Sequence, residues 1–205
     1  MKIIQINPQN PEKSRIEHAL KVLENDGVII YPTDTIYGMG ANIYSDNAIH
    51  KVYSIKKRSY NKPLSVCISK IKDIDKIAYL NDEKDLIKKI LPGPFTIILN
   101  KKEHVSPILN AGGKKIGIRI PDNKICRELT SKFPITSTSA NISGEPVPKS
   151  VEEITEQVSE QVDLIIDSGK ADGIPSTVLD CTISPPKILR KGAGELKYLT
   201  NSKNL

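Results

Sequence analysis

The hydrophobic and polar positions of the chain predict short strands interleaved with helices. In the clearest helical segment, apolar residues recur at spacings of three and four, and Gly27 follows as a stop signal. Its inward face is predicted to be Ile16, Ala19, Leu20 and Leu23, with Asn10 as N-cap and Pro11 as the first helical residue. Further helices are predicted from Ser45 or Asp46, from Asn81 or Asp82, from Asp122 to Phe133, and after the capping box Ser150 and Glu153.

The strands are predicted from β-branched runs bounded by turn residues. They are residues 3–6, 28–31, 64–69, 95–99, 116–120, a segment from 134, 164–167, 176–181 and 187–190. Strands that alternate with helices, and join more directly near the C-terminus, predict an α/β sheet of mixed direction. We expect one domain over residues 1–205, with a core of about residues 10–199 and a polar C-terminal tail.

The chain is organised around residues 28–40, where a buried strand is followed by polar residues. Pro32 cannot donate to a strand ladder, so pairing should stop there and expose Thr33-Asp34-Thr35 as a polar tip. Gly38 and Gly40 then allow backbone or ligand to come close. Ligands of α/β sheets bind at such strand ends, although an ordinary turn rich in Thr and Asp explains this stretch equally well.

Two other features could belong to the same site. A second strand is predicted to end in the polar run 136–144, and Lys56-Lys57-Arg58 follows a helix. Alternation with Ile116, Ile118 and Ile120 places Arg119 on the opposite face of its strand. Taken alone, the cations at 56–62 suit a solvated helix end, and Arg119 suits a surface charge.

Composition excludes several classes of protein. No apolar run approaches the ~20 residues of a membrane span, and no signal peptide is evident, so we expect a cytoplasmic protein. Three cysteines and three histidines are scattered without ligand spacing, so neither a disulfide framework nor a protein-built metal site is predicted. A net charge of +6 favours anionic partners such as nucleotides or RNA.

Familiar nucleotide and nucleophile motifs are also absent from the sequence. There is no GxxxxGK[ST] loop, no complete dinucleotide fingerprint, and no Ser-x-x-Lys or Gly-x-Ser-x-Gly motif. What remains is a set of hydroxyl-rich strand ends and cations. Such side chains can hold a phosphate ester and a small polar substrate without covalent catalysis.

Eight short motifs in collinear order together resemble the YrdC-like threonylcarbamoyl-AMP synthase family, in its short, single-domain form. They are Tyr31-Pro-Thr-Asp-Thr-Ile-Tyr-Gly38, Lys56-x-Arg58, Lys62-Pro-Leu64, Pro92-Gly-Pro-x-Thr96, Arg119-x-Pro121, Ser139-Ala-Asn-x-Ser-Gly144, Ser176-Thr-Val and Arg190-x-Gly192. The resemblance implies an open, twisted α/β sheet with a concave basic cavity. There L-threonine, bicarbonate and ATP would form threonylcarbamoyl-adenylate and pyrophosphate, for the modification of tRNA by a downstream threonylcarbamoyl transferase.

The resemblance also implies roles for individual residues. Lys56 and Arg58 would be catalytic. Threonine would contact Thr35, Cys67, Arg119, Ser137 and Ser176, and ATP would contact Arg58, Lys62, Lys115, Ser139, Asn141, Val147 and Arg190. Cations suit the anionic charge that gathers on the phosphates, and Mg²⁺ is expected to arrive with ATP rather than on dedicated protein ligands.

The chain departs from the family pattern at two positions. Ser59 stands where a proline usually follows the KxR arginine, so the loop loses one source of rigidity. Cys67 stands where relatives often have a histidine near the threonine, which weakens the case for that contact.

Two alternative functions fit the same sequence features. One is a basic surface that binds transfer RNA or double-stranded RNA through its phosphates without catalysis. The other is a carbamoyltransferase domain of the same fold, which normally accompanies cysteine-rich fingers that this chain lacks.

Overall fold

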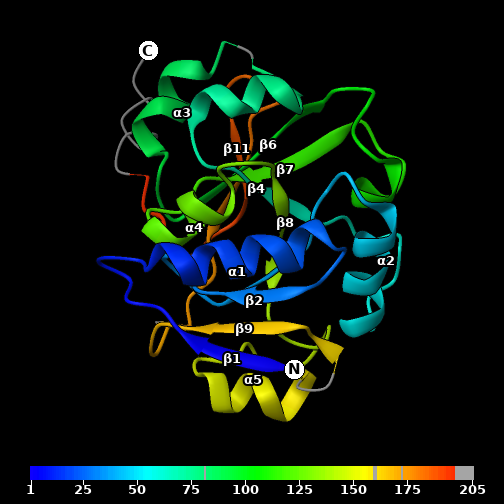
Figure 1. Ribbon diagram of the computed structural model, residues 1–205. Helices are drawn as coiled ribbons and strands as arrows, with labels where there is room; N and C mark the ends of the chain where they lie inside the picture. Colours follow the sequence, from blue (N-terminus) through cyan, green and yellow to red (C-terminus); the bar gives the residue numbers. More distant parts are fainter. Residues whose placement is uncertain (81, 159–160, 172, 197–205) are drawn as a thin grey trace.

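The computed structural model describes residues 1–80, 82–158, 161–171 and 173–196. These form one mixed sheet in the order β1-β9-β2-β3-β8-β4-β7-β6-β10-β11, with β5 paired to β6 (Figure 1). The pairs β1–β9, β2–β9, β4–β7 and β6–β10 are parallel, and the others are antiparallel. The predicted mixed α/β sheet is therefore confirmed.

The elements match most of the predicted segments. The strands are β1 Lys2–Gln5, β2 Ile29–Tyr31, β3 Gly38–Gly40, β4 Ser65–Cys67, β5 Ala78–Tyr79, β6 Phe95–Lys101, β7 Lys115–Arg119, β8 Ile135–Ser139, β9 Leu164–Asp167, β10 Thr177–Asp180 and β11 Lys187–Arg190. The helices are α1 Lys13–Glu24, α2 Asp46–Ile55, α3 Lys84–Ile90, α4 Lys124–Leu129 and α5 Val151–Val158, with 3₁₀ turns η1 Ile71–Lys76 and η2 Pro107–Asn110.

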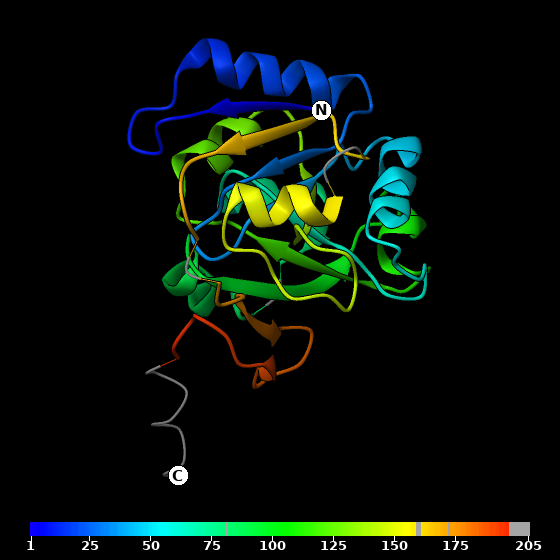
Figure 2. The same cartoon turned by 90° about the horizontal axis from the view of Figure 1, so that it is seen from below.

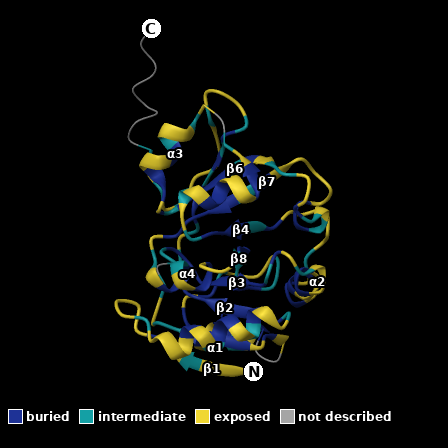
Figure 3. Ribbon diagram, turned by 45° about the horizontal axis from the view of Figure 1, so that its top comes forward, coloured by how far each residue is buried: buried dark blue, intermediate teal, exposed yellow. Residues whose placement is uncertain are grey.

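The helices cover the two faces of the sheet separately. On one face, α1 and α4 bury their apolar stripes against β2, β8 and β9. On the other face, α2, α3 and α5 pack over the larger core. Figure 2 shows α1 and α5 on opposite sides of β1 and β9. In Figure 3 the central strands are buried, the edge strand β1 is largely exposed, and the helices expose their outer surfaces.

Three helices begin later than the sequence patterns predict, and one of them is α3, which starts at Lys84 after Glu83 rather than at Asp82. Asn7 Oδ1 accepts from the backbone nitrogens of Gln9 and Asn10, and this turn delays α1 to Lys13, so Asn10 and Pro11 are not its first residues. Asn123 rather than Asp122 caps α4, through a 3.1 Å bond from the backbone nitrogen of Cys126.

The end of α4 also differs from the prediction. The helix stops at Leu129 instead of Phe133. The hydroxyls of Thr130 and Ser131 donate to the carbonyls of Cys126 and Glu128, which competes with continuation of the helix. The predicted starting residue Asn81 and the tail after Leu199 lie outside the described residues.

Strand β3 was not predicted, because its sequence Gly-Met-Gly has little strand propensity. It forms through antiparallel pairing with β2 on one side and β8 on the other. A Cβ atom at Gly38 or Gly40 would come within 3 Å of the Tyr31 ring. The close approach that these glycines permit is therefore made by a core tyrosine, whose hydroxyl donates to Thr136 O.

One stretch of the sheet is left uncovered because its side chains are small. Cys67 and Ile135 pack in the core beside α4, and residues two positions away on a strand share the same face. On β4 and β8 those residues are Ser65 and Ser137, and on β7 Gly117 is two positions from Arg119, the strand partner of Cys67; Ser65, Gly117 and Ser137 all line a cavity. The cavity floor is therefore a continuation of the face that α1 and α4 cover.

Candidate active site

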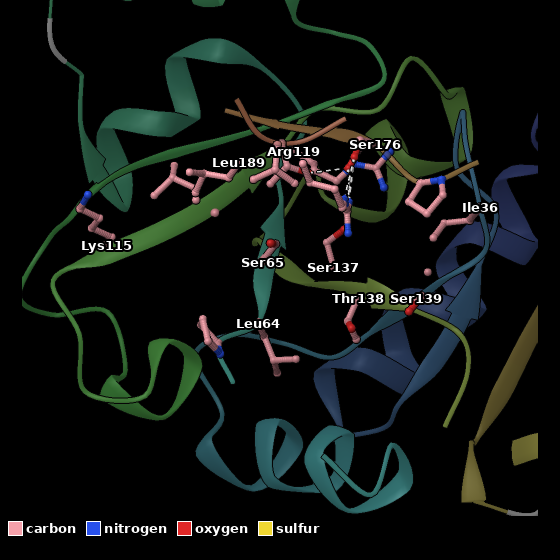
Figure 4. A pocket seen from close by; sticks show the side chains of 18 of the residues that line it. Ile36, Leu64, Ser65, Lys115, Arg119, Ser137, Thr138, Ser139, Ser176 and Leu189 are labelled. Carbon is pink, nitrogen blue, oxygen red and sulfur yellow. Dashed lines mark hydrogen bonds between the residues drawn. The ribbon is translucent and has the colours of Figure 1, made fainter. Parts of the chain in front are cut away.

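The floor opens into a cavity of about 400 Å³, a volume in the range of small-molecule sites. Side chains from β4, β6, β7, β8, β10 and β11 converge on it (Figure 4). Four of the lining side chains are cations, namely Arg58, Lys115, Arg119 and Arg190, and Asp180 is the one acid among the described lining residues. Hydroxyls from Ser65, Thr96, Ser137, Thr138, Ser139 and Ser176 supply the other polar groups.

The end of α2 sets the position of Arg58. Lys57 has a φ of 47°, in the left-handed region, and the backbone nitrogen of Arg58 donates to Tyr53 O over 2.9 Å. This is a Schellman ending, which turns the chain sharply after the helix. The guanidinium then donates from Nε to Lys62 O at 3.1 Å and from Nη2 to Pro63 O at 2.9 Å. Burial lowers the pKa of Arg58, but an arginine stays charged.

Arg119 is fixed by the polar tip that follows β2. Its Nη2 donates to Asp34 Oδ1 and to Thr35 Oγ1, each over 2.8 Å. The other oxygen of Asp34 accepts from the backbone nitrogen of Asp122 at 3.1 Å. Arg119 is only 6% exposed, and its Nε has no hydrogen-bond partner. A buried guanidinium with a spare donor, on the cavity wall, is suited to an anionic ligand.

Arg119 does lie on the strand face opposite Ile116, Ile118 and Ile120, as alternation predicted. It is buried, however, and the alternative of a solvated surface charge does not describe it.

A second cluster joins β6, β10 and β11. Thr96 Oγ1 and Ser176 Oγ lie 2.8 Å apart, and Arg190 donates from Nη2 to Ser176 O at 2.8 Å and to Ser176 Oγ at 3.3 Å. Burial and the nearby charge of Arg119 lower the pKa of Arg190. Figure 4 shows Ser176 and Arg119 close together above Ser137.

Lys115 lies at the far end of the cavity from Ile36 in Figure 4. Its Nζ pairs with Asp180 Oδ2 at 2.9 Å. Burial of Asp180 opposes ionisation, but hydrogen bonds from Lys115 and Thr182 outweigh it and hold the pKa of the carboxyl below its usual value. Lys115 is therefore a half-exposed cation that already has one anionic partner.

Lys56 does not line the cavity. Its side chain is 1% exposed, and Nζ donates to Ser139 O at 2.5 Å, Asn141 O at 2.7 Å and Asn141 Oδ1 at 3.1 Å. Asn141 Oδ1 also accepts from Ser139 Oγ, while its Nδ2 donates to Glu145 O. The Lys56 ammonium therefore stabilises the turn after β8 from the side away from the cavity. Of the residues bonded in this way, Ser139 is the one that lines the cavity.

This lysine gives the protein a testable pH dependence. Burial, with a contribution from the Arg58 charge, lowers the pKa of Lys56 from 10.5 to about 7. The unfolded chain therefore binds more protons between about pH 7 and pH 10, so this group makes the free energy of unfolding rise with pH across that window. Relative to Lys56→Met, the wild type is expected to gain about 2 kcal/mol from pH 7 to pH 9, measured by urea denaturation. Lys57→Met, at an exposed neighbour, is the matched control, and a pH-independent difference for Lys56→Met would contradict the shift.

The structure brings together most of the residues proposed from the sequence. The cavity lining includes Arg58, Lys115, Arg119, Ser137, Ser139, Val147, Ser176 and Arg190. Thr35 and Asn141 lie just behind it, bonded to Arg119 and Ser139. Cys67 is fully buried in the core beside α4, and the side chain of Lys62 is exposed outside the lining.

Sequence reasoning assigned no role to four residues that build the site. Thr96, Asp180, Asp34 and Gly117 contribute a hydroxyl pair, an ion pair, the partner of Arg119 and space on the floor. Thr96 and Asp34 were inside the recognised motifs, so their motif membership was the available signal. Asp180 and Gly117 gave none, because their roles depend on neighbours from other strands.

Fold and site together define a class: an open α/β sheet with a cation-rich, hydroxyl-lined cavity. Residues 21–192 match the family model Sua5/YciO/YrdC, described as "Telomere recombination". A relative from Methanocaldococcus jannaschii is 47% identical over 87% of this chain and 86% of its own length, and its name provisionally makes it a threonylcarbamoyl-AMP synthase. The chain belongs to the Sua5/YciO/YrdC family.

Solved structures show the same architecture. Pyrococcus abyssi Sua5, determined with L-threonine, has a TM-score of 0.88 at 33% identity, over 94% of this chain and 58% of that one. Escherichia coli YciO has a TM-score of 0.89 at 30% identity, over 96% of this chain and 98% of that one. Among the described residues, no helix has the length and apolar character needed to span a membrane.

Proposed function

We propose that this protein is an L-threonylcarbamoyladenylate synthase, which makes threonylcarbamoyl-AMP and pyrophosphate from L-threonine, bicarbonate and ATP. The observation that carries the proposal is one cavity that combines a buried arginine with a spare donor and three further cations along its wall. The synthase names of the relatives, and the threonine complex of Sua5, support this substrate class.

The threonine end of the cavity is proposed to lie around Arg119. Its guanidinium binds the substrate carboxylate, while Ser137 and Ser176 bond the amine or hydroxyl of the substrate. Thr35 acts on the same end by orienting Arg119 over 2.8 Å. A site that hydrogen-bonds a hydroxyl rejects analogues that lack it, which separates threonine from valine.

The nucleotide end is proposed to use the remaining cations. Arg58, Lys115 and Arg190 bind the phosphates, with Ser139 and the backbone at Val147 beside the nucleotide. Lys62 lies near the end of the loop that follows α2, and its exposed side chain meets the outer phosphates only if it turns inward. Lys56 and Asn141 act by holding the Ser139 turn.

The reaction is balanced within these substrates. The amine of threonine and bicarbonate give a carbamate and water, and a carbamate oxygen then attacks the α-phosphorus of ATP while pyrophosphate leaves. Negative charge gathers on the α-phosphate and on the leaving group in this step. Fixed cations in a partly enclosed cavity stabilise that charge more than water does.

Mg²⁺ is proposed to enter with ATP. Within the part of the chain that the structure describes, no group of three or more His, Cys, Asp or Glu side chains could hold a metal ion. Asp180, the one carboxylate of the described lining, is already bonded by Lys115 and Thr182. When bound, the metal would neutralise phosphate charge, which suits an ion held mainly by phosphate oxygens.

The product is proposed to pass to a tRNA threonylcarbamoyl transferase, and the net positive charge allows contact with tRNA.

The function is tested with purified protein, ATP, Mg²⁺, bicarbonate and one amino acid at a time. Pyrophosphate release is expected only when both threonine and bicarbonate are present. Equal release with valine or serine would refute the substrate assignment. Salt-sensitive RNA binding without any pyrophosphate would instead favour a binding module.

A further inference from the structure

The loop that carries Arg58 is anchored by an aromatic cluster on α2. This loop spans residues 57–63 and lacks the proline that the family pattern has after the arginine, since Ser59 stands there. A proline would restrict the backbone of the loop directly. Other contacts must therefore keep Arg58 at the cavity wall.

Tyr60 provides such contacts from the middle of the loop. Its ring stacks on the ring of Tyr53 with centroids 4.5 Å apart and an interplanar angle of 30°. Its hydroxyl lies 2.8 Å from His50 Nδ1, and the His50 ring meets it edge-on. His50 and Tyr53, on successive turns of α2, therefore both contact the side chain of Tyr60, although Tyr60 itself is 50% exposed.

Tyr53 connects Tyr60 to the backbone that holds Arg58. It is 1% exposed, and its hydroxyl is 3.1 Å from both Lys62 O and Ile108 O, to which it can donate. Burial raises the pKa of Tyr53, so the hydroxyl remains a donor. Lys62 O also accepts from Arg58 Nε. The same carbonyl therefore receives bonds from Tyr53 and Arg58, which ties the guanidinium to the cluster.

We propose that Tyr60, held by Tyr53 and His50, is a positioning residue that keeps Arg58 in its ATP-binding orientation. The inference rests on the proposed function for the identity of the ligand. Tyr60 is not among the residues that line the cavity, so it acts through the loop.

The first measurement is hydrogen exchange of the backbone amides of Lys57, Arg58 and Lys62, which are hydrogen-bonded in the structure, and it needs no substrate. Tyr60→Ala is expected to speed exchange there at least tenfold, and Tyr60→Phe, which keeps the stack and loses the bond to His50, is expected to speed it less. Tyr44→Ala, at another exposed tyrosine, is the matched control. Unchanged exchange in Tyr60→Ala would overturn the proposal.

The second measurement is calorimetric titration of ATP and of threonine into the wild type, Tyr60→Ala, Arg58→Ala and the double variant. Tyr60→Ala is expected to weaken ATP binding about five- to twentyfold and to leave threonine binding within twofold. In the Arg58→Ala background, Tyr60→Ala is expected to have no further effect on ATP binding. A merely structural role would weaken both ligands, or would weaken ATP equally in both backgrounds, and either result would overturn the proposal.

The two proposals fail separately in these experiments. If the wild type releases no pyrophosphate but Tyr60 and Arg58 remain coupled in ATP binding, the synthase assignment fails and the positioning role stands. If pyrophosphate release is normal and the coupling is absent, the positioning role alone is refuted.

Discussion

Replacement of Arg58 by alanine is expected to lower kcat/KM for ATP about 100- to 1000-fold, which corresponds to roughly 2.7–4 kcal/mol of transition-state stabilisation. Arg58 is half-buried in the cavity wall, and two of its nitrogens are already anchored on Lys62 O and Pro63 O. The remaining donors are therefore held in place before ATP arrives, and no reorganisation is needed when charge develops. Initial rates of pyrophosphate release over a range of ATP concentrations give the value.

Arg15→Ala is the matched control for this experiment. Arg15 lies on α1 outside the cavity lining and pairs with Glu12 on the surface. It is expected to keep wild-type kinetics. Turnover of Arg58→Ala within threefold of wild type, with the free energy of unfolding unchanged, would contradict a role for Arg58 at the phosphates.

Replacement of Arg119 by lysine is expected to weaken threonine binding about 10- to 100-fold while ATP affinity changes little. Lysine keeps the charge but loses the planar fork, and a single ammonium cannot serve Asp34, Thr35 and a substrate carboxylate with the same geometry. A loss of one charge-assisted hydrogen bond, at about 1.5–3 kcal/mol, accounts for a change of this size. Calorimetric titration of each ligand separately measures it.

Arg127→Lys is the control for the loss of an arginine as such, because Arg127 lies half-exposed on α4 and pairs with Asp122, which precedes the helix. An ATP defect larger than the threonine defect in Arg119→Lys would move Arg119 to the nucleotide end. Unchanged affinity for both ligands would remove it from the binding site.

The Asp34–Arg119 ion pair adds a constraint to this prediction. Both hydrogens of Arg119 Nη2 are engaged, by Asp34 and Thr35, Nε is buried without a partner, and Nη1 makes no hydrogen bond within the described residues. Nη1 is therefore the donor open to a substrate carboxylate, and a bidentate bond along either edge of the guanidinium requires Asp34 or Thr35 to yield a hydrogen of Nη2.

Hydrophobic periodicity was enough to predict the large elements of the fold. The helical stripe of α1 and the β-branched run of β2 are local patterns, and both appear where they were predicted. Strand β3 was missed because pairing with β2 and β8, rather than its own residues, makes it a strand. The start of α1 moved because Asn7 forms a turn with Gln9 and Asn10 ahead of the helix, and the start of α4 moved because Asn123 accepts from the backbone nitrogen of Cys126.

The residues of the site were predicted mainly from motifs, and the motifs do not say which of these residues bond to one another. Asp34 and Arg119 are 85 residues apart in the chain, and no spacing rule links them. Lys56 belongs to a recognised motif, but its three oxygen partners place it beneath the cavity rather than on its wall. Such distinctions depend on which atoms meet across strands, and a linear pattern does not record that.

The floor of the cavity also sets a limit on how this protein can be stabilised. A methyl group at Gly117 would stand 2.5 Å from Ser65 Oγ and 3.3 Å from Thr96 Cγ2, inside the space that a ligand needs. A design method that maximises packing would replace Ser65, Gly117 and Ser137, because these small residues leave space unfilled in an otherwise well-packed sheet. Larger apolar residues fitted there would extend the core that α1 and α4 cover, and would do so by closing the site. At these positions, natural selection for binding and engineering for thermal resistance act in opposite directions.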